Sequence, residues 1–182
     1  MPMNQIQFQR GVSMLEFFER YGIEAQCVAA LMELRWPHGF RCPRCVLAEH
    51  YVVGHGARKL FQCRGCRHQT SLTSGTLMES TKLPLRTWFL AIYLSSQDKT
   101  GLSELALKRH LGTSYHTAWL IQQKLMKTMA QRDSEQPLTG SIQLDDADQG
   151  RERPGVGARG SINKVPIVAA VSICDEGHPL RV

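Results

Sequence analysis

Four of the six cysteines in this 182-residue chain fall into two matched pairs. Two residues separate the cysteines within each pair, and 17 residues lie between the pairs. Each C-x2-C segment folds as a tight knuckle, and a hairpin between the knuckles brings all four sulfurs onto one ion. Four thiolates match tetrahedral Zn²⁺ with a closed shell, so we predict a structural zinc site whose binding is coupled to folding. Iron binds the same set of ligands, which are Cys42, Cys45, Cys63 and Cys66.

Basic side chains surround the two cysteine pairs. A tetrathiolate zinc site carries a formal charge of about −2, so some of these cations offset the sulfurs. We expect the others to meet DNA phosphates, with Arg44, Arg64 and Arg67 as candidate contacts. The alternative is a solvated, charged loop. The basic residues of this stretch are Arg41, Arg44, Arg58, Lys59, Arg64 and Arg67.

Residues 102–124 have the pattern of a short helix, a turn and a second helix. Ser103 caps the first helix, Gly112 ends it, and Thr113 or Ser114 caps the second. A helix-turn-helix of this kind reads DNA by placing the start of its second helix in the major groove. The alternative is an ordinary helical hairpin. The net charge of +10 over residues 41–132 (14 basic, 4 acidic) favours the DNA interpretation.

The DNA interpretation assigns roles to particular side chains of this unit. The candidates for base edges, at the start of the second helix, are Ser114, Tyr115, His116 and Thr117. The candidates for backbone phosphates are Lys108, Arg109 and Lys124. The side chains expected to pack the two helices together are Leu105, Ala106, Leu111, Ala118, Trp119 and Leu120.

Three aspartates follow a short apolar strand predicted at residues 142–144. Asp145, Asp146 and Asp148 would then lie at the end of that strand. Carboxylates in such a position suit Mg²⁺ or Mn²⁺, and two-metal phosphoryl-transfer sites use acidic groups of this kind from several strands. The alternative is an ordinary aspartate-rich turn.

Helices and strands must hold these candidate sites in place, and the sequence predicts an α+β protein of several parts. Apolar stripes predict helices within residues 14–34, broken at Gly22, and within residues 84–97, with Pro84 in the first turn. From Ser141 onward the pattern changes to strands, including a buried one at 165–174 and the start of another at 180–182. The predicted parts are an N-terminal helical segment (1–38), a zinc ribbon (39–80), a helical DNA-binding region (81–132), a linker (133–140) and the first strands of a further domain (141–182).

Composition and charge exclude several classes of protein. No apolar run reaches about 18 residues, and charged residues interrupt the first 30, so we expect neither a membrane span nor a signal peptide. We therefore expect a cytoplasmic, nucleoid-associated protein whose thiols stay reduced, with Cys27 and Cys174 as packing residues. Residues 1–132 carry a net charge of +9 and residues 133–182 a net charge of −3, as expected of a polyanion-binding part joined to a different one.

The order of these motifs resembles the bacterial insertion-sequence transposases that begin with a zinc ribbon and carry a ribonuclease-H-like catalytic domain of the DDE type. The Phe-x-Cys-Pro-x-Cys pattern of that family stands at residues 40–45. The other stretches that carry the resemblance are residues 71–76, 82–91, 114–119 and 142–145.

The resemblance implies DNA cleavage and joining at the terminal repeats of the element, with two Mg²⁺ or Mn²⁺ ions and a homo-oligomeric strand-transfer complex. Asp145 matches the first catalytic aspartate of the family, and Asp146 stands where the family usually has glutamate. Gly150 matches a family glycine, but Asp148 and Gln149 depart from the usual aromatic and apolar pair.

The chain reaches Val182 before the positions of the other catalytic residues of that family. We therefore expect a truncated transposase with an incomplete ribonuclease-H-like domain, which binds DNA and zinc but lacks competent strand transfer. Two other hypotheses remain open. One is a non-catalytic zinc-ribbon and helix-turn-helix regulator of DNA, and the other is an RNA-binding ribbon protein.

Overall fold

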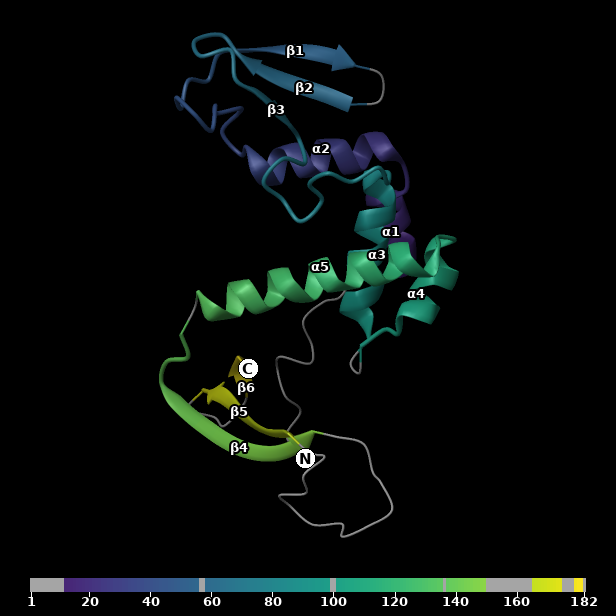
Figure 1. The fold of residues 1–182 in the computed structure, drawn as a ribbon, viewed down its shortest axis with the longest axis vertical. Coiled ribbons are helices and arrows are strands. Elements are labelled where there is room, and N and C mark those ends of the chain that lie inside the picture. The colour runs from purple at the N-terminus through teal and green to yellow at the C-terminus, as the bar shows by residue number, and fades with distance from the viewer. Residues whose placement is uncertain are drawn as a thin grey trace. The chain divides into compact units, whose positions relative to one another are not determined.

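A computed structural model describes residues 12–55, 58–98, 101–135, 137–149, 165–174 and 179–181. Within them lie five helices and two three-stranded sheets, so the predicted mixed α+β class is confirmed (Figure 1). Val12–Gln131 form one compact unit, and the described residues from Arg132 onward belong to a second. No helix in the described part of the chain combines the length and the apolar character that a membrane crossing needs.

The chain enters the first unit through two helices that meet near Gly22. α1 (Met14–Tyr21) begins with a capping box, in which the Glu16 N–H donates to Ser13 Oγ at 3.2 Å and the Ser13 N–H donates to Glu16 Oε2 at 2.9 Å. α2 (Glu24–Arg35) follows directly. The break predicted at Gly22 is present, and a Cβ there would approach the Phe18 carbonyl oxygen to 2.2 Å.

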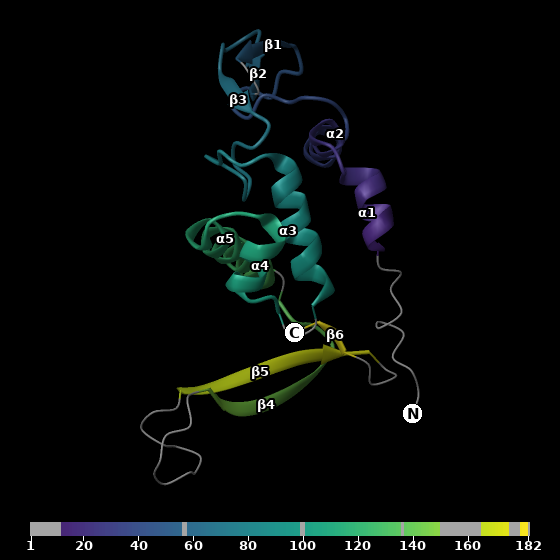
Figure 2. The same ribbon diagram turned by 90° about the vertical axis from the view of Figure 1, so that its right-hand side faces the viewer.

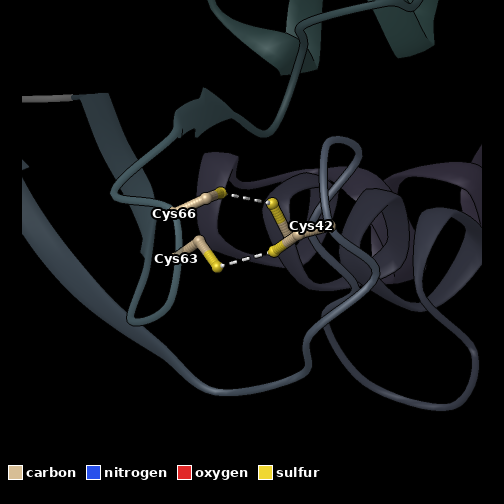
Figure 3. A group of neighbouring side chains, drawn as sticks. Cys42, Cys63 and Cys66 are labelled. Carbon is tan, nitrogen blue, oxygen red and sulfur yellow. Dashed lines mark hydrogen bonds between the residues drawn. The ribbon is translucent and has the colours of Figure 1, made fainter.

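The ribbon contains a small antiparallel sheet in the order β1 (His50–His55), β2 (Arg58–Cys63), β3 (Gln69–Ser71). In the β1–β2 hairpin His50 is paired with Cys63, so the second cysteine pair begins where β2 ends. The hairpin connects the two cysteine pairs and places them at the same end of the sheet (Figure 3).

Three more helices complete this unit: α3 (Leu85–Gln97), α4 (Glu104–Leu111) and α5 (Tyr115–Ser134). Pro84 is the residue before α3 rather than part of its first turn. The Glu24 carboxylate in α2 takes the place of a local cap, since its two oxygens accept from the N–H groups of Leu85 at 2.7 Å and Arg86 at 3.0 Å. In Figure 2, α3 stands between α1 on one side and α4 and α5 on the other.

One apolar core runs from the ribbon through the helices. The predicted packing of α4 against α5 is partly wrong, because Leu105, Trp119 and Leu120 are 55%, 39% and 42% exposed. Leu107 and Ile121 are buried instead, together with the correctly predicted Ala118; the spacing of three from Ala118 to Ile121 puts both on one face of α5. The buried apolar core comprises Cys27, Leu31, Phe40, Cys42, Phe61, Cys63, Leu72, Met78, Leu85, Trp88, Ala91, Leu107, Ala118 and Ile121.

The second unit contains an antiparallel sheet in the order β4 (Ser141–Gln149), β5 (Val165–Ile173), β6 (Pro179–Arg181). β4 is longer than predicted, so Asp145 lies in the middle of the strand, opposite Ala169, and not at its end. The prediction that β5 is buried is wrong for most of its length, and Val168 is 73% exposed, since no described element covers it. α5 extends to Ser134, two residues into the predicted linker.

Candidate metal centre

The two cysteine pairs adopt the same backbone arrangement. In the first knuckle the Cys42 N–H donates to the Leu47 carbonyl at 3.0 Å, and in the second the Cys63 N–H donates to the His68 carbonyl at 2.9 Å. In both, the carbonyl of the first cysteine accepts from the N–H of the residue four positions later, at 2.9 and 3.1 Å. Two segments that differ in sequence therefore fold as equivalent knuckles.

The residue after each pair has a left-handed backbone. Val46 has φ 62° and Arg67 has φ 56°, and neither is glycine. This conformation is costly for residues with a Cβ, above all for a β-branched one, and it is found where the surrounding structure requires it. Sequence reasoning missed these two positions because glycine, its usual signal, is absent from them.

The four sulfurs converge between the knuckles (Figure 3). Cys42 Sγ lies 3.5 Å from Cys66 Sγ, Cys45 Sγ lies 3.4 Å from Cys63 Sγ, and all four are within 4.8 Å of one another. A Zn–S distance of about 2.3 Å implies about 3.8 Å between the sulfurs of a regular tetrahedron. The donor set and its spacing therefore fit a four-coordinate zinc ion.

The acidity of the thiols shows why this cluster suits a cation. Burial raises the pKa of Cys42, but hydrogen bonds from the N–H groups of Arg44 and Cys45 and from the neighbouring thiols of Cys66 and Cys45 together lower it to about 6. The Leu47 N–H lowers the pKa of Cys45, but the neighbouring sulfurs, led by Cys63, raise it to about 12. The Cys42 thiol is therefore stabilised as a thiolate, whereas deprotonation of Cys45 is disfavoured. A divalent cation bound among the sulfurs would stabilise both thiolates.

An aromatic cluster fixes the ribbon to α2. The Trp36 ring lies 5.0 Å from Phe40 and 4.8 Å from Phe61, measured between ring centroids, and Phe40 and Phe61 are stacked at 5.6 Å. The Arg35 guanidinium donates to the carbonyl groups of Ser71, at 3.2 Å, and Leu72. The metal centre is therefore held by the helical core as well as by its own hairpin.

The cations proposed for DNA differ in what surrounds them. Arg64 forms a 3.5 Å ion pair with Glu49, and its guanidinium carbon lies 4.6 Å from the centroid of the Tyr51 ring. Arg44 and Arg67 are exposed, and neither takes part in an ion pair within the described residues. Two of the three predicted contacts thus remain available to a phosphate.

The turn between α4 and α5 has clear local causes. The Ala106 N–H donates to Ser103 Oγ at 3.3 Å, and Gly112 ends α4 with φ 63°. Ser114 then caps α5, accepting from the Thr117 N–H at 3.1 Å. The predicted caps at Ser103 and Ser114 and the stop at Gly112 are therefore present.

The candidates for base contact are accessible to different degrees. Ser114 and Thr117 also bind each other through their hydroxyls, at 2.9 Å. Tyr115 and His116 are exposed, and the His116 ring is stacked on Trp119 with centroids 6.2 Å apart. Tyr115 and His116 are therefore the side chains at the start of α5 most open to a ligand.

The three phosphate candidates of this region have different environments. Lys108 and Arg109 are exposed in the last turn of α4. Lys124 Nζ donates to the Glu79 carbonyl at 2.9 Å and lies 5.6 Å from the centroid of the Trp88 ring. A phosphate contact by Lys124 stays a prediction, and it would have to compete with these internal contacts.

The aspartates of β4 form no comparable centre. Neighbouring residues of a strand point to opposite faces of the sheet, so Asp145 and Asp146 are directed apart. Among the described residues, the one group of three or more potential ligand side chains close together is that of Cys42, Cys45, Cys63 and Cys66. A catalytic role for Asp145 stays a prediction.

Two comparisons with known proteins bear on this centre. Residues 22–69, which contain all four cysteines, match a protein-family model described as a transposase zinc-ribbon domain. The chain is also 28% identical over 127 residues to a protein of Halobacterium salinarum described as an uncharacterized protein in transposable element ISH50. That similarity covers 68% of this chain and 41% of the relative, so the chain matches less than half of that protein's length.

No solved structure matches the chain significantly. The two sequence comparisons agree with the motif-based resemblance and confirm it: the chain is similar to insertion-sequence transposases that have an N-terminal zinc ribbon.

Proposed function

We propose that this chain is the DNA-binding part of an insertion-sequence transposase, and that it recognises the double-stranded terminal repeats of the element. The observation that carries the proposal is the convergence of four sulfurs within 4.8 Å in a stretch similar to transposase zinc ribbons. The net charge of +10 over residues 41–132 supplies the attraction to a polyanion.

The role of zinc in this proposal is structural. Cys42, Cys45, Cys63 and Cys66 would hold the ion, which would neutralise thiolate charge and fix the two knuckles. Four protein ligands leave no open position, so the ion would not act on DNA directly. Its effect on binding would come through the positions of Arg44 and Arg67.

The second contact surface is the pair α4 and α5, interpreted as a helix-turn-helix. The exposed side chains of Tyr115 and His116 would face base edges, and Lys108 and Arg109 would meet phosphates. At the start of α5 the hydroxyls of Ser114 and Thr117 bind each other, and in the ribbon Arg64 is paired with Glu49, so contacts of these three residues with DNA would compete with those bonds.

DNA binding is tested with a terminal-repeat duplex, a scrambled duplex and an RNA hairpin, each titrated with zinc-loaded protein at several salt concentrations. The expected result is preference for the terminal repeat and a steep loss of affinity with salt. A salt slope near zero would refute the basic footprint. Equal or better binding of the RNA would favour the RNA-binding hypothesis.

A second candidate is a regulator that binds the same DNA without cutting it. It is favoured by the position of Asp145 in the middle of β4, opposite Ala169, because the resemblance to transposases puts the first catalytic aspartate at the end of its strand. A strand-transfer assay with Mn²⁺ and a terminal-repeat duplex separates the candidates. Activity of this chain alone would refute the regulator, whereas binding without strand transfer would support it. In a strand-transfer complex the chain would act as a homo-oligomer.

A further inference from the structure

A cavity of about 280 Å³ lies where α1, α3 and α4 meet. It is distinct from the zinc centre and from the residues at the start of α5. Its wall combines aromatic and aliphatic carbon with cationic and hydroxyl groups. The residues that matter for its chemistry are Phe17, Phe18, Leu90, Arg86, Thr87 and His110.

The polar groups of this cavity lack partners of their own. Neither the Arg86 guanidinium nor the His110 ring takes part in an ion pair or a hydrogen bond among the described residues. Glu24 is the acidic residue bonded to the start of α3, but both of its carboxylate oxygens are used by the backbone N–H groups of Leu85 and Arg86. No acidic side chain lines the cavity. The cavity is therefore suited to an anion.

The position of the cavity indicates which anion. His110 belongs to the last turn of α4, where Lys108 and Arg109 are also exposed. When the second helix of a helix-turn-helix enters the major groove, the first helix crosses the sugar–phosphate backbone. A duplex bound at Tyr115 and His116 would thus carry a phosphate past this end of α4.

We propose that the cavity takes one backbone phosphate of bound DNA, held by Arg86, Thr87 and His110. This inference rests on the proposed DNA-binding function. A guanidinium presents paired donors that match two phosphate oxygens, and the Thr87 hydroxyl and the His110 ring add further donors. Phe17 is buried, whereas Phe18, Arg86 and His110 are exposed, so a phosphate would reach these donors directly from solvent.

The test compares Arg86→Gln with Arg20→Gln in the full zinc-loaded chain. Both variants remove one arginine charge, but Arg20 lies on α1 and does not line the cavity. Arg86→Gln should weaken terminal-repeat binding about fivefold and reduce the slope of log K against log salt by about 0.9, the value for one lost phosphate contact. Arg20→Gln should leave that slope unchanged. Arg86→Lys keeps the charge and should retain the slope.

A second measurement distinguishes failure of this inference from failure of the proposed function. The ring resonances of His110 are followed by NMR during titration with inorganic phosphate and with duplex. Phosphate should shift them in the natural chain and in Arg20→Gln but not in Arg86→Gln. Absence of any binding to DNA would refute the proposed function, and the phosphate titration would still test the anion site.

Two results would overturn the inference while DNA binding persists. Equal salt slopes for Arg86→Gln and Arg20→Gln would show that no DNA phosphate enters the cavity, even if inorganic phosphate shifts His110. An unchanged His110 resonance on addition of both phosphate and duplex would exclude an anion there altogether. Zinc content and circular dichroism verify that each variant is folded.

Discussion

The cap of α3 by Glu24 is a contact between residues 61 positions apart in sequence, and its removal has a calculable effect. Glu24→Ala leaves two N–H groups at the start of α3 without their acceptor. The Leu85 N–H belongs to a buried residue, and losing its bond to a charged oxygen costs about 1.5 kcal/mol. Water replaces the acceptor at the exposed Arg86, and loss of the charge–dipole interaction adds about 0.5 kcal/mol. The free energy of unfolding should therefore fall by about 2 kcal/mol.

The assay is urea unfolding of the zinc-saturated protein, followed by circular dichroism. With an m-value of about 2 kcal/mol/M, the midpoint should fall by about 1 M. Glu33→Ala is the control, since Glu33 is an exposed carboxylate on the same helix. Glu24→Gln retains one acceptor and should lose about half as much stability. A Glu24→Ala midpoint equal to that of Glu33→Ala would refute the assigned cap.

Four further predictions concern the ribbon and α5. Cys63→Ser should abolish stoichiometric zinc binding, measured by mass spectrometry under native conditions, and expose the ribbon to proteolysis. Zinc should be released on acidification, because protons compete with the ion for the thiolates. The pKa of Cys42, lowered to about 6, makes this sulfur available to zinc as a thiolate at neutral pH. A chromogenic chelator monitors the release. Val46→Gly should leave the free energy of unfolding unchanged or raise it by up to about 1 kcal/mol, because glycine adopts the left-handed conformation of this residue without strain. The control Val52→Gly, in strand β1, should lower the free energy of unfolding by about 1 kcal/mol. Lys124→Met should lower the free energy of unfolding by about 1 kcal/mol, because the hydrogen bond to the Glu79 carbonyl is lost.

Each of these predictions has an outcome that contradicts it. Full zinc occupancy in Cys63→Ser would exclude Cys63 as a required ligand. Zinc retention that does not depend on pH would contradict thiolate ligation. Equal destabilisation by Val46→Gly and Val52→Gly would show that the left-handed conformation of Val46 stores no strain. An unchanged free energy of unfolding in Lys124→Met would show that the contacts of Lys124 do not stabilise the fold.

The ribbon and the helix ends were predictable because their signals are local. The spacing of Cys42 and Cys45 determines the knuckle by itself, and the cap at Ser103 and the stop at Gly112 depend on a single turn of helix. Apolar periodicity likewise placed the helices on either side of Gly22. In these cases the residues that determine the structure are close together in sequence.

Other features depend on contacts that the sequence does not display. Apolar periodicity did not distinguish Leu107, which is buried, from Leu105, which is exposed, because both belong to a short helix with apolar residues on several sides. Lys124 binds the Glu79 carbonyl and lies over the Trp88 ring, and both residues belong to distant segments. The start of α3 depends on Glu24 in another helix.

The strand that contains Asp145 shows a different limit. An aspartate pair is typical of a turn, so the predicted strand ended at residue 144. The observed strand continues because β5 offers a full partner, opposite Asp145 at Ala169 and opposite Asp146 at Val168. Pairing between strands overrides the weak intrinsic preference of aspartate for turns.

The apolar core that joins the ribbon to the helices has a geometric consequence for recognition. In the proposed DNA complex, this continuous core would keep the knuckles and the start of α5 at a constant separation along the duplex. B-form DNA turns once in about 10.5 base pairs, and inserting about 5 between two recognised segments moves one of them to the opposite side. If the proposed function holds, the two recognised segments of the terminal repeat should tolerate only insertions that keep them on the same side of the duplex.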